Sequence, residues 1–319
     1  KYILLLIMKE NKMIKILIQI PCYNEEAEIQ KTIDEIKRNT FEIQNLKILI
    51  IDDGSNDNTL QIVRDKVDFV VSHKFNKGLG LAFQTGLNFA KENDFDYLIN
   101  LDADNQYKSE YIKNLLKTIE ENKYDIVIGA RNFDEIEHFS FTKKKLQELG
   151  SWVIKIISKQ KISDASSGFR VYSKKAIKKL NCSSKFSYTL DTIIQATDKN
   201  LKIGETKIKI NKPTRKSRLF KSNTQFVLNQ AKIILKCFAI YKPFTFFLYL
   251  SILPLFFGFS LFLRFLFFYF SGDGTGHVQS IIFGSTSLIL GFILIALGVL
   301  GELIKHNRKI MEENEEKKF

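Results

Sequence analysis

The chain has 319 residues, enough for one large domain or two ordinary ones. Its 48 Lys and Arg residues exceed its 35 Asp and Glu residues, and the net charge of +13 suits anionic lipid headgroups or phosphorylated substrates. The three cysteines are widely spaced and basic residues are not interleaved with clustered aromatic ones, which argues against a disulfide framework, a zinc site or nucleic acid as a partner.

The first two thirds of the chain alternate short apolar runs with amphipathic stretches. Residues 1–12 are expected to be a disordered lead, because their apolar run is too short for a signal peptide or a membrane span. Continuous apolar runs separated by helices are typical of a parallel sheet covered on both faces, so we expect a doubly wound α/β domain over 13–222. The expected strands cover 15–20, 47–51, 68–71, 96–101, 125–128 and 207–210, and the expected helices cover 25–38, 60–66, 79–92, 110–122, 146–158 and 188–198.

The last third of the chain has the composition of a membrane anchor. Residues 223–242 predict a juxtamembrane amphipathic helix, which lies in the membrane interface or packs on the preceding domain. The region 243–304 contains two apolar stretches that are each long enough to cross a bilayer. Lys and Arg flank this pair and are missing from its connector, so the positive-inside rule places the globular domain and both termini, including a tail over 305–319, in the cytoplasm.

Two carboxylates one residue apart end the apolar run 97–101. Asp102 and Asp104 flank Ala103, where a buried strand is expected to reach the rim of the sheet. Such a pair can hold a hard divalent cation against a diphosphate, and Gln106 can supply a third oxygen. The sequence therefore predicts a site for Mg²⁺ or Mn²⁺ at this edge.

Three more loops are expected at the same edge, because ligands bind where parallel strands end. The segment Pro21-Cys22-Tyr23-Asn24-Glu25 either caps the next helix or contacts a ligand. In Asp52-Asp53-Gly54 the adjacent like charges favour a ligand contact over a plain turn. Lys77 and Gly78 open a helix, where backbone N–H groups can approach a phosphate.

The second half of the domain offers basic residues for an anionic acceptor. Arg170 ends the segment that begins at Ser163, and its guanidinium suits phosphate; the alternative is an ordinary arginine on a surface loop. The basic run 212–218 either attracts anionic lipid or folds over bound phosphates. The four histidines are scattered, and none is assigned a catalytic role.

Six short segments follow one another in a fixed order along the chain. They are Pro21-x-Tyr23-Asn24-Glu25, Asp52-Asp53-Gly54-Ser55, Asn76-x-Gly78, Asp102-x-Asp104-x-Gln106, Gly129-Ala130-Arg131 and Asp164-x-x-Ser167-Gly168-Phe169-Arg170. In this order they resemble the inverting glycosyltransferases of family 2, which have the GT-A fold, and among them the dolichyl-phosphate mannose synthase-like branch. One departure is Lys143-Lys144-Lys145 through Leu149, where members often carry Arg and Ser.

The resemblance implies a UDP- or GDP-linked sugar as donor and assigns roles to residues. Residues implied to bind the nucleotide are Pro21, Tyr23, Asn24, Glu25, Asp53, Lys77, Gly78, Asp102 and Ala103, together with Arg215 and Ser217 of a mobile active-site loop. Asp102, Asp104 and Gln106 would hold Mg²⁺ or Mn²⁺. Arg131 and Arg170 would lie on the acceptor side, with Asp164 as a positioning group.

The reaction implied is an in-line displacement by a polyprenyl phosphate, dolichyl or undecaprenyl, with inversion of configuration. A phosphate monoester is already anionic near neutral pH, so a strong general base is unnecessary. One alternative is a saccharide or lipid-linked oligosaccharide acceptor, for which Asp164 or Asp191 would become the base. The other is a membrane-anchored scaffold that binds nucleotide sugar without turnover. The sequence leaves the oligomeric state open.

Overall fold

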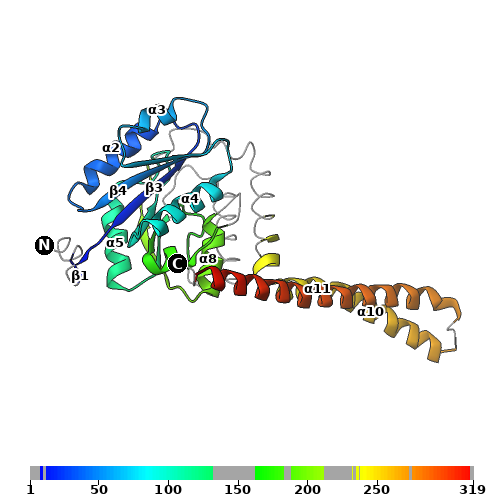
Figure 1. Cartoon of the computed structure of the whole chain (residues 1–319). Helices are drawn as coiled ribbons and strands as arrows, with labels where there is room; N and C mark the ends of the chain where they lie inside the picture. The colour runs from blue at the N-terminus through cyan, green and yellow to red at the C-terminus, as the bar shows by residue number, and fades with distance from the viewer. Residues whose placement is uncertain are drawn as a thin grey trace. The chain divides into compact units, whose positions relative to one another are not determined.

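The computed structural model describes residues 8–9, 12–131, 162–182, 188–211, 232, 235–236, 238–272 and 275–316. The chain divides into two units, Lys1–Gln230 and Ala231–Phe319 (Figure 1). The predicted helix 146–158, the residues Arg215 and Ser217, and most of the predicted juxtamembrane helix lie outside the described residues.

The first unit is built on a seven-stranded sheet in the order β5-β4-β3-β6-β8-β7-β9. Every described pairing in this sheet is parallel except those of β8, which runs antiparallel to β6 and β7. The expected α/β domain with a mostly parallel sheet is thus confirmed. The strands are β3 (Ile16–Cys22), β4 (Leu46–Asp52), β5 (Phe69–Ser72), β6 (Tyr97–Asn100), β7 (Ile126–Arg131), β8 (Arg170–Ser173) and β9 (Ile203–Ile208).

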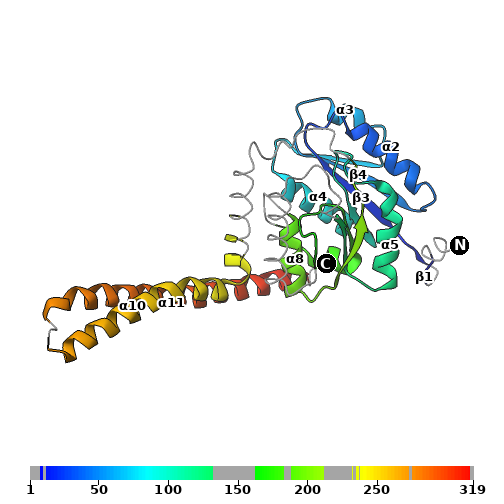
Figure 2. The ribbon, with the colours of Figure 1, turned by 180° about the vertical axis from the view of Figure 1, so that it is seen from behind.

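Helices cover both faces of this sheet (Figure 2). Two of the predicted helices have the expected bounds, α4 and α8, whereas β8 and α7 were not predicted. The described helices of the first unit are α2 (Ile29–Thr40), α3 (Thr59–Val63), α4 (Leu79–Glu92), η1 (Ser109–Tyr111), α5 (Ile112–Glu121), α7 (Lys174–Lys179) and α8 (Tyr188–Asp198).

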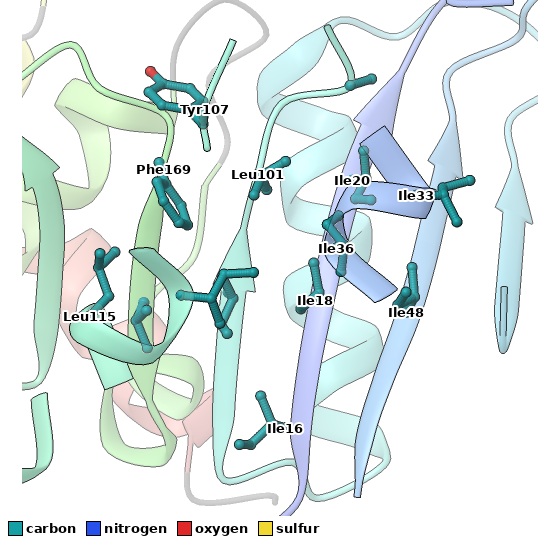
Figure 3. Close-up of a cluster of buried hydrophobic side chains, with 14 of the residues drawn as sticks. Ile16, Ile18, Ile20, Ile33, Ile36, Ile48, Leu101, Tyr107, Leu115 and Phe169 are labelled. Carbon is teal, nitrogen blue, oxygen red and sulfur yellow. The ribbon is translucent and has the colours of Figure 1, made fainter. Parts of the chain in front are cut away.

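Alternate residues of the central strands face opposite layers of the molecule. Ile16, Ile18 and Ile20 of β3 belong to a core that α2 and α5 cover, and Figure 3 shows this cluster. Leu17 and Gln19, on the other face, are also fully buried, and Gln19 lies against Gly86 of α4. Because both faces are covered, the strands have the continuous apolar character of a parallel sheet.

Two local expectations need correction. The structure pairs Met8–Lys9 (β1) with Lys12–Met13 (β2), and all of these residues except Met13 lie in the stretch 1–12 that was expected to be disordered. In addition, the strand expected over 15–20 does not end before Pro21, because β3 continues to Cys22, paired with β4. Its pairing with β6 ends at Gln19, so Pro21 has a strand neighbour on one side only, which a residue without an N–H tolerates.

The second unit contains two helices that are long and apolar enough to cross a membrane, α10 (Pro243–Phe270) and α11 (Val278–Glu316), joined through η3 (Thr275–His277). They approach closely, because a Cβ added to Gly258 would lie 2.8 Å from the carbonyl oxygen of Gly284. α11 continues beyond its apolar stretch to Glu316, so most of the predicted tail is helical.

Candidate active site

The loops that follow β3 and β4 are bound to each other at the carboxyl edge of the sheet. Asn24 has a positive φ of 56°, and its side-chain oxygen accepts a hydrogen bond from Asn56 N at 2.8 Å. Its own backbone N–H donates to Ser55 Oγ at 2.9 Å. Asn24 therefore joins these two loops, and its expected contact with the nucleotide stays a prediction.

Asp102 and Asp104 lie directly after β6 at the same edge. Burial of Asp102 and the neighbouring charge of Asp104 raise the pKa of the Asp102 carboxyl to about 7, against the partial compensation of Arg131. Asp104 Oδ1 accepts a hydrogen bond from Gln106 N at 3.2 Å, and Ala103 is buried between the two acids. The structure therefore brings together two carboxylates whose mutual repulsion is not fully relieved by the protein.

This donor set fits a hard divalent cation. Two close carboxylates favour Mg²⁺ or Mn²⁺ over softer metals, and a cation would offset both the burial and the neighbouring Asp104 charge that raise the pKa of Asp102. Within the described residues no group of three or more His, Cys, Asp or Glu side chains could hold a metal by itself. The remaining ligands would then come from Gln106, from water and from a bound diphosphate.

Asp53, expected to contact the nucleotide, is bonded to the backbone at the start of α4 and to His73. It is 3% exposed, and its two carboxylate oxygens accept hydrogen bonds from Lys77 N at 2.9 Å and Gly78 N at 2.8 Å. His73 Nδ1 lies 2.7 Å from Asp53 Oδ1, and His73 Nε2 lies 2.9 Å from Thr85 Oγ1. The N–H groups that were expected to receive a phosphate thus hold the Asp53 carboxylate, and the sequence contained no signal for the role of His73.

Three further residues expected to touch the nucleotide lie at the end of β3 and in the loop that follows it. Tyr23 is 38% exposed, whereas Pro21 is buried within the strand. Glu25 donates its backbone N–H to Thr59 Oγ1 at 2.8 Å, and its charge contributes to the raised pKa of Asp102. Tyr23 and Glu25 therefore lie on the side of the sheet edge that holds the acids, and their nucleotide contacts stay predictions.

Arg131 and Asp164 form a buried ion pair. Arg131 Nε and Nη2 donate to the two Asp164 oxygens at 2.7 and 3.0 Å, and Nη2 also donates to Ser166 Oγ at 2.7 Å. The side chain of Asp164 is 0% exposed and that of Arg131 is 13% exposed. Burial alone would raise the pKa of Asp164, but the Arg131 charge and its hydrogen bonds outweigh burial and lower this pKa.

Arg170 does not lie where a phosphate could reach it. It is 0% exposed on β8, and within the described residues its guanidinium donates to four protein oxygens, Ser167 O, Thr189 O, Thr192 Oγ1 and Ala165 O, at 2.8 to 3.0 Å. The expectation that Arg170 grips an acceptor is therefore wrong for this structure. Its role is to fasten the loop 164–168 to α8.

We expect Arg170→Met to destabilise the protein by about 3 kcal/mol, because several buried carbonyl groups lose their donor at about 1–3 kcal/mol each while the cost of burying a charge is removed. The free energy of unfolding in detergent measures this effect. Lys178→Met, at an exposed position of α7, is the control and should change stability by less than about 0.5 kcal/mol. Unchanged stability of Arg170→Met would contradict the structural role.

The segment before the predicted mobile loop is fastened to the metal-site loop. Asn211 N donates to Gln106 O at 2.8 Å, and Asn211 Nδ2 donates to Asn105 O at 3.0 Å. Asn105 itself has a positive φ of 54°. Asn211 is the last described residue of this segment and lies beside the loop that carries Asp104 and Gln106, whereas Arg215 and Ser217 lie outside the described residues.

Comparison with known proteins gives the chain a family. The model of the family described as Glycosyl transferase family 2 matches residues 17–180. A UDP-N-acetylglucosamine–dolichyl-phosphate N-acetylglucosaminyltransferase of Methanococcus voltae is 30% identical over 214 residues, which cover 60% of this chain and 83% of that protein. An undecaprenyl-phosphate mannosyltransferase of Micrococcus luteus is 26% identical over 165 residues, which cover 50% of this chain and 66% of that protein.

Solved structures support the fold. Glucosyl-3-phosphoglycerate synthase from Mycobacterium tuberculosis, in complex with Mn²⁺, UDP and glucosyl-3-phosphoglycerate, superposes with a TM-score of 0.56 at 16% identity, covering 70% of this chain and 79% of that one. At this identity the likeness shows the GT-A-like fold. Together with the matched residues and the order of the loops around Asp102 and Asp104, these comparisons show that the chain belongs to glycosyl transferase family 2.

Proposed function

We propose that this glycosyltransferase moves a sugar from a UDP- or GDP-linked donor to a polyprenyl phosphate in the membrane, with inversion at the anomeric carbon and dependence on a divalent cation. The relatives named for transfer to dolichyl and undecaprenyl phosphate support this choice of acceptor. The two long apolar helices support a membrane location, with the globular domain on the cytoplasmic side.

One observation carries the choice of a phosphate over a sugar hydroxyl as acceptor: both carboxylates considered as bases are engaged. Asp164 is paired with Arg131, and its lowered pKa makes it a poor proton acceptor. Asp191 is 2% exposed and bonded to Cys182 Sγ at 3.3 Å and Gln195 Nε2 at 3.1 Å. A phosphate oxygen can attack without losing a proton to the protein, so it needs neither residue.

The chain's own residues would arrange an in-line displacement. One oxygen of the lipid phosphate forms a bond to the anomeric carbon, while the bond from that carbon to the diphosphate breaks on the opposite face. Asp102, Asp104 and Gln106 would hold Mg²⁺ or Mn²⁺, which supplies stabilisation of the charge that grows on the leaving diphosphate. The Asp164 carboxylate holds Arg131 oriented at the end of β7, on the side proposed for the acceptor.

The test is a transfer assay on membranes that contain the full chain. A panel of labelled UDP- and GDP-sugars is incubated with dolichyl or undecaprenyl phosphate and with Mn²⁺ or Mg²⁺, and label is measured in the lipid extract. We expect lipid-linked label for at least one donor, and loss of at least 95% of it with excess EDTA. NMR of the product should show an anomeric configuration opposite to that of the donor.

Three results would contradict the proposal in different ways. Label in a saccharide acceptor without lipid phosphate would show that the acceptor class is wrong. Full activity in EDTA would remove the metal role. Binding of nucleotide sugar without any turnover across the panel would favour a scaffold.

A further inference from the structure

Two carboxamide side chains face each other between the central strands, Gln19 in the middle of β3 and Asn100 at the end of β6. Gln19 of β3 and Asn100 of β6 are register partners, and both are 0% exposed. Gln19 Nε2 donates to Asn100 Oδ1 at 2.8 Å, and a Cβ on Gly86 of α4 would overlap Gln19 Oε1. Polar groups buried this deeply are costly unless they are bonded, so this pair needs an explanation beyond packing.

Asn100 connects this pair to the backbone of Gly168 by a hydrogen bond. Asn100 Nδ2 donates to the carbonyl oxygen of Gly168 at 2.9 Å and to Tyr188 Oη at 2.8 Å. Tyr188 Oη lies 3.3 Å from the same carbonyl oxygen. On the other side, the N–H of Gly168 donates to Tyr107 Oη at 3.0 Å. Three side chains thus hold both polar groups of one residue.

Gly168 lies against the carboxylate of Asp102. A Cβ at this glycine would be 2.8 Å from both Asp102 oxygens and 2.7 Å from Tyr188 Oη. The φ of Gly168 is outside the left-handed region, so the backbone conformation itself does not require glycine here. What requires it is the close approach of the Asp102 carboxylate on one side and the Tyr188 hydroxyl on the other.

Tyr188 is held rigidly. It is 1% exposed on α8, and its ring stacks on Phe83 of α4 with centroids 4.3 Å apart and planes 7° apart. Tyr172 is also fully buried and packs on Phe83 at 5.5 Å, but its hydroxyl has no hydrogen-bond partner among the described residues. The two tyrosines therefore share an aromatic neighbour and differ in whether the hydroxyl reaches Gly168.

We infer that Asn100 and Tyr188 are positioning residues for the divalent cation site. They act by fixing the position of Gly168, against which the Asp102 carboxylate packs. This inference rests on the proposed function, because it assumes that Asp102 is a cation ligand. Removing a side chain that orients a metal ligand without touching the metal typically weakens metal affinity about 10–100-fold. Asn100, Gly168 and Tyr188 belong to three separate segments, β6, the loop before β8, and α8, so this arrangement forms only in the folded domain.

The test measures Mn²⁺ affinity of the purified full chain in detergent by EPR of free Mn²⁺, with and without UDP. Tyr188→Phe removes only the hydroxyl and keeps the ring on Phe83, and we expect it to weaken Mn²⁺ binding about tenfold. Tyr172→Phe is the matched control and should stay within twofold of the wild type. Thermal unfolding of both variants tests whether the difference in affinity is separate from stability.

Gly168→Ala is the second variant and places a methyl group against both Asp102 oxygens. We expect it to weaken Mn²⁺ binding at least tenfold as well. Wild-type Mn²⁺ affinity in both Tyr188→Phe and Gly168→Ala would overturn the inference, even if the wild type transfers sugar. If these variants bind Mn²⁺ more weakly than the wild type, but the wild type transfers no sugar, the inference is supported and the proposed function is contradicted. A wild type that binds no Mn²⁺ would overturn the inference and the proposed metal site together.

Discussion

Asp104→Asn is expected to lower sugar transfer at least about 1,000-fold, which corresponds to about 4 kcal/mol of lost transition-state stabilisation. The substitution halves the charge of the carboxylate pair that is proposed to hold the cation. It should leave the fold intact, because the contact of Asp104 Oδ1 with Gln106 N needs only an acceptor, which the Asn side-chain oxygen also provides. Initial rates of transfer into lipid, at saturating donor and Mn²⁺, measure the effect.

The control for this variant is Asp65→Asn, which makes the same change of charge at an exposed position after α3. It should retain transfer within twofold of the wild type. Normal expression in membranes and an unchanged melting temperature of Asp104→Asn separate a lost ligand from a lost fold. If Asp104→Asn kept more than a tenth of wild-type turnover, the cation would have to be held elsewhere.

Much of the sheet could be predicted because strands that are buried on both faces have continuous apolar runs in the sequence. The runs around Ile48 and Leu98 are continuously apolar, which distinguishes them from half-exposed strands. Since parallel strands end at one edge, the positions of Asp53 and Asp102 in one rim followed from their places in sequence alone. The bounds of α4 and α8 also followed from their apolar spacing.

β8 could not be predicted because its first residue is a fully buried arginine. A charged residue in a short apolar run is normally assigned to the surface. What makes Arg170 tolerable is a set of carbonyl and hydroxyl acceptors from the loop before it and from α8, up to 22 residues away in sequence. No local pattern identifies that set, so both the strand and the internal role of Arg170 were missed.

The same limit explains the expected roles of Lys77 and Gly78. The sequence shows a group of backbone donors at a helix start and a group of acids at a strand end, and both suggest a ligand. It does not show that they satisfy each other, which they do through Asp53. Gln19 and Asn100 lie 81 residues apart and gave no signal separately, since each reads as an ordinary polar interruption of an apolar run.

Asp102→Asn should abolish transfer and, in the absence of metal, stabilise the fold at alkaline pH. The folded-state pKa of Asp102, about 7, lies above the value of about 3.9 expected in the unfolded chain, so the folded state binds the extra proton between these limits. The wild-type free energy of unfolding therefore falls as pH rises from about 4 to above 7, and Asn does not titrate. At pH 8 we expect the variant to be more stable by on the order of 2 kcal/mol, or about 4–8 °C in melting temperature.

The dependence on pH and metal distinguishes this effect from a general stabilisation. At pH 4.5 the melting temperatures of the two proteins should nearly coincide, because Asp102 is protonated in the folded wild type. At pH 8, Mn²⁺ at about 100 times its Kd should stabilise the wild type by about 2.7 kcal/mol and remove the advantage of the variant, which has lost a ligand. A variant that is less stable than the wild type at pH 8 without metal would show that burial and the Asp104 charge do not destabilise the ionised Asp102 carboxylate in the folded protein. The acid pair would then be a structural element, and the cost that a bound cation is proposed to relieve would not exist.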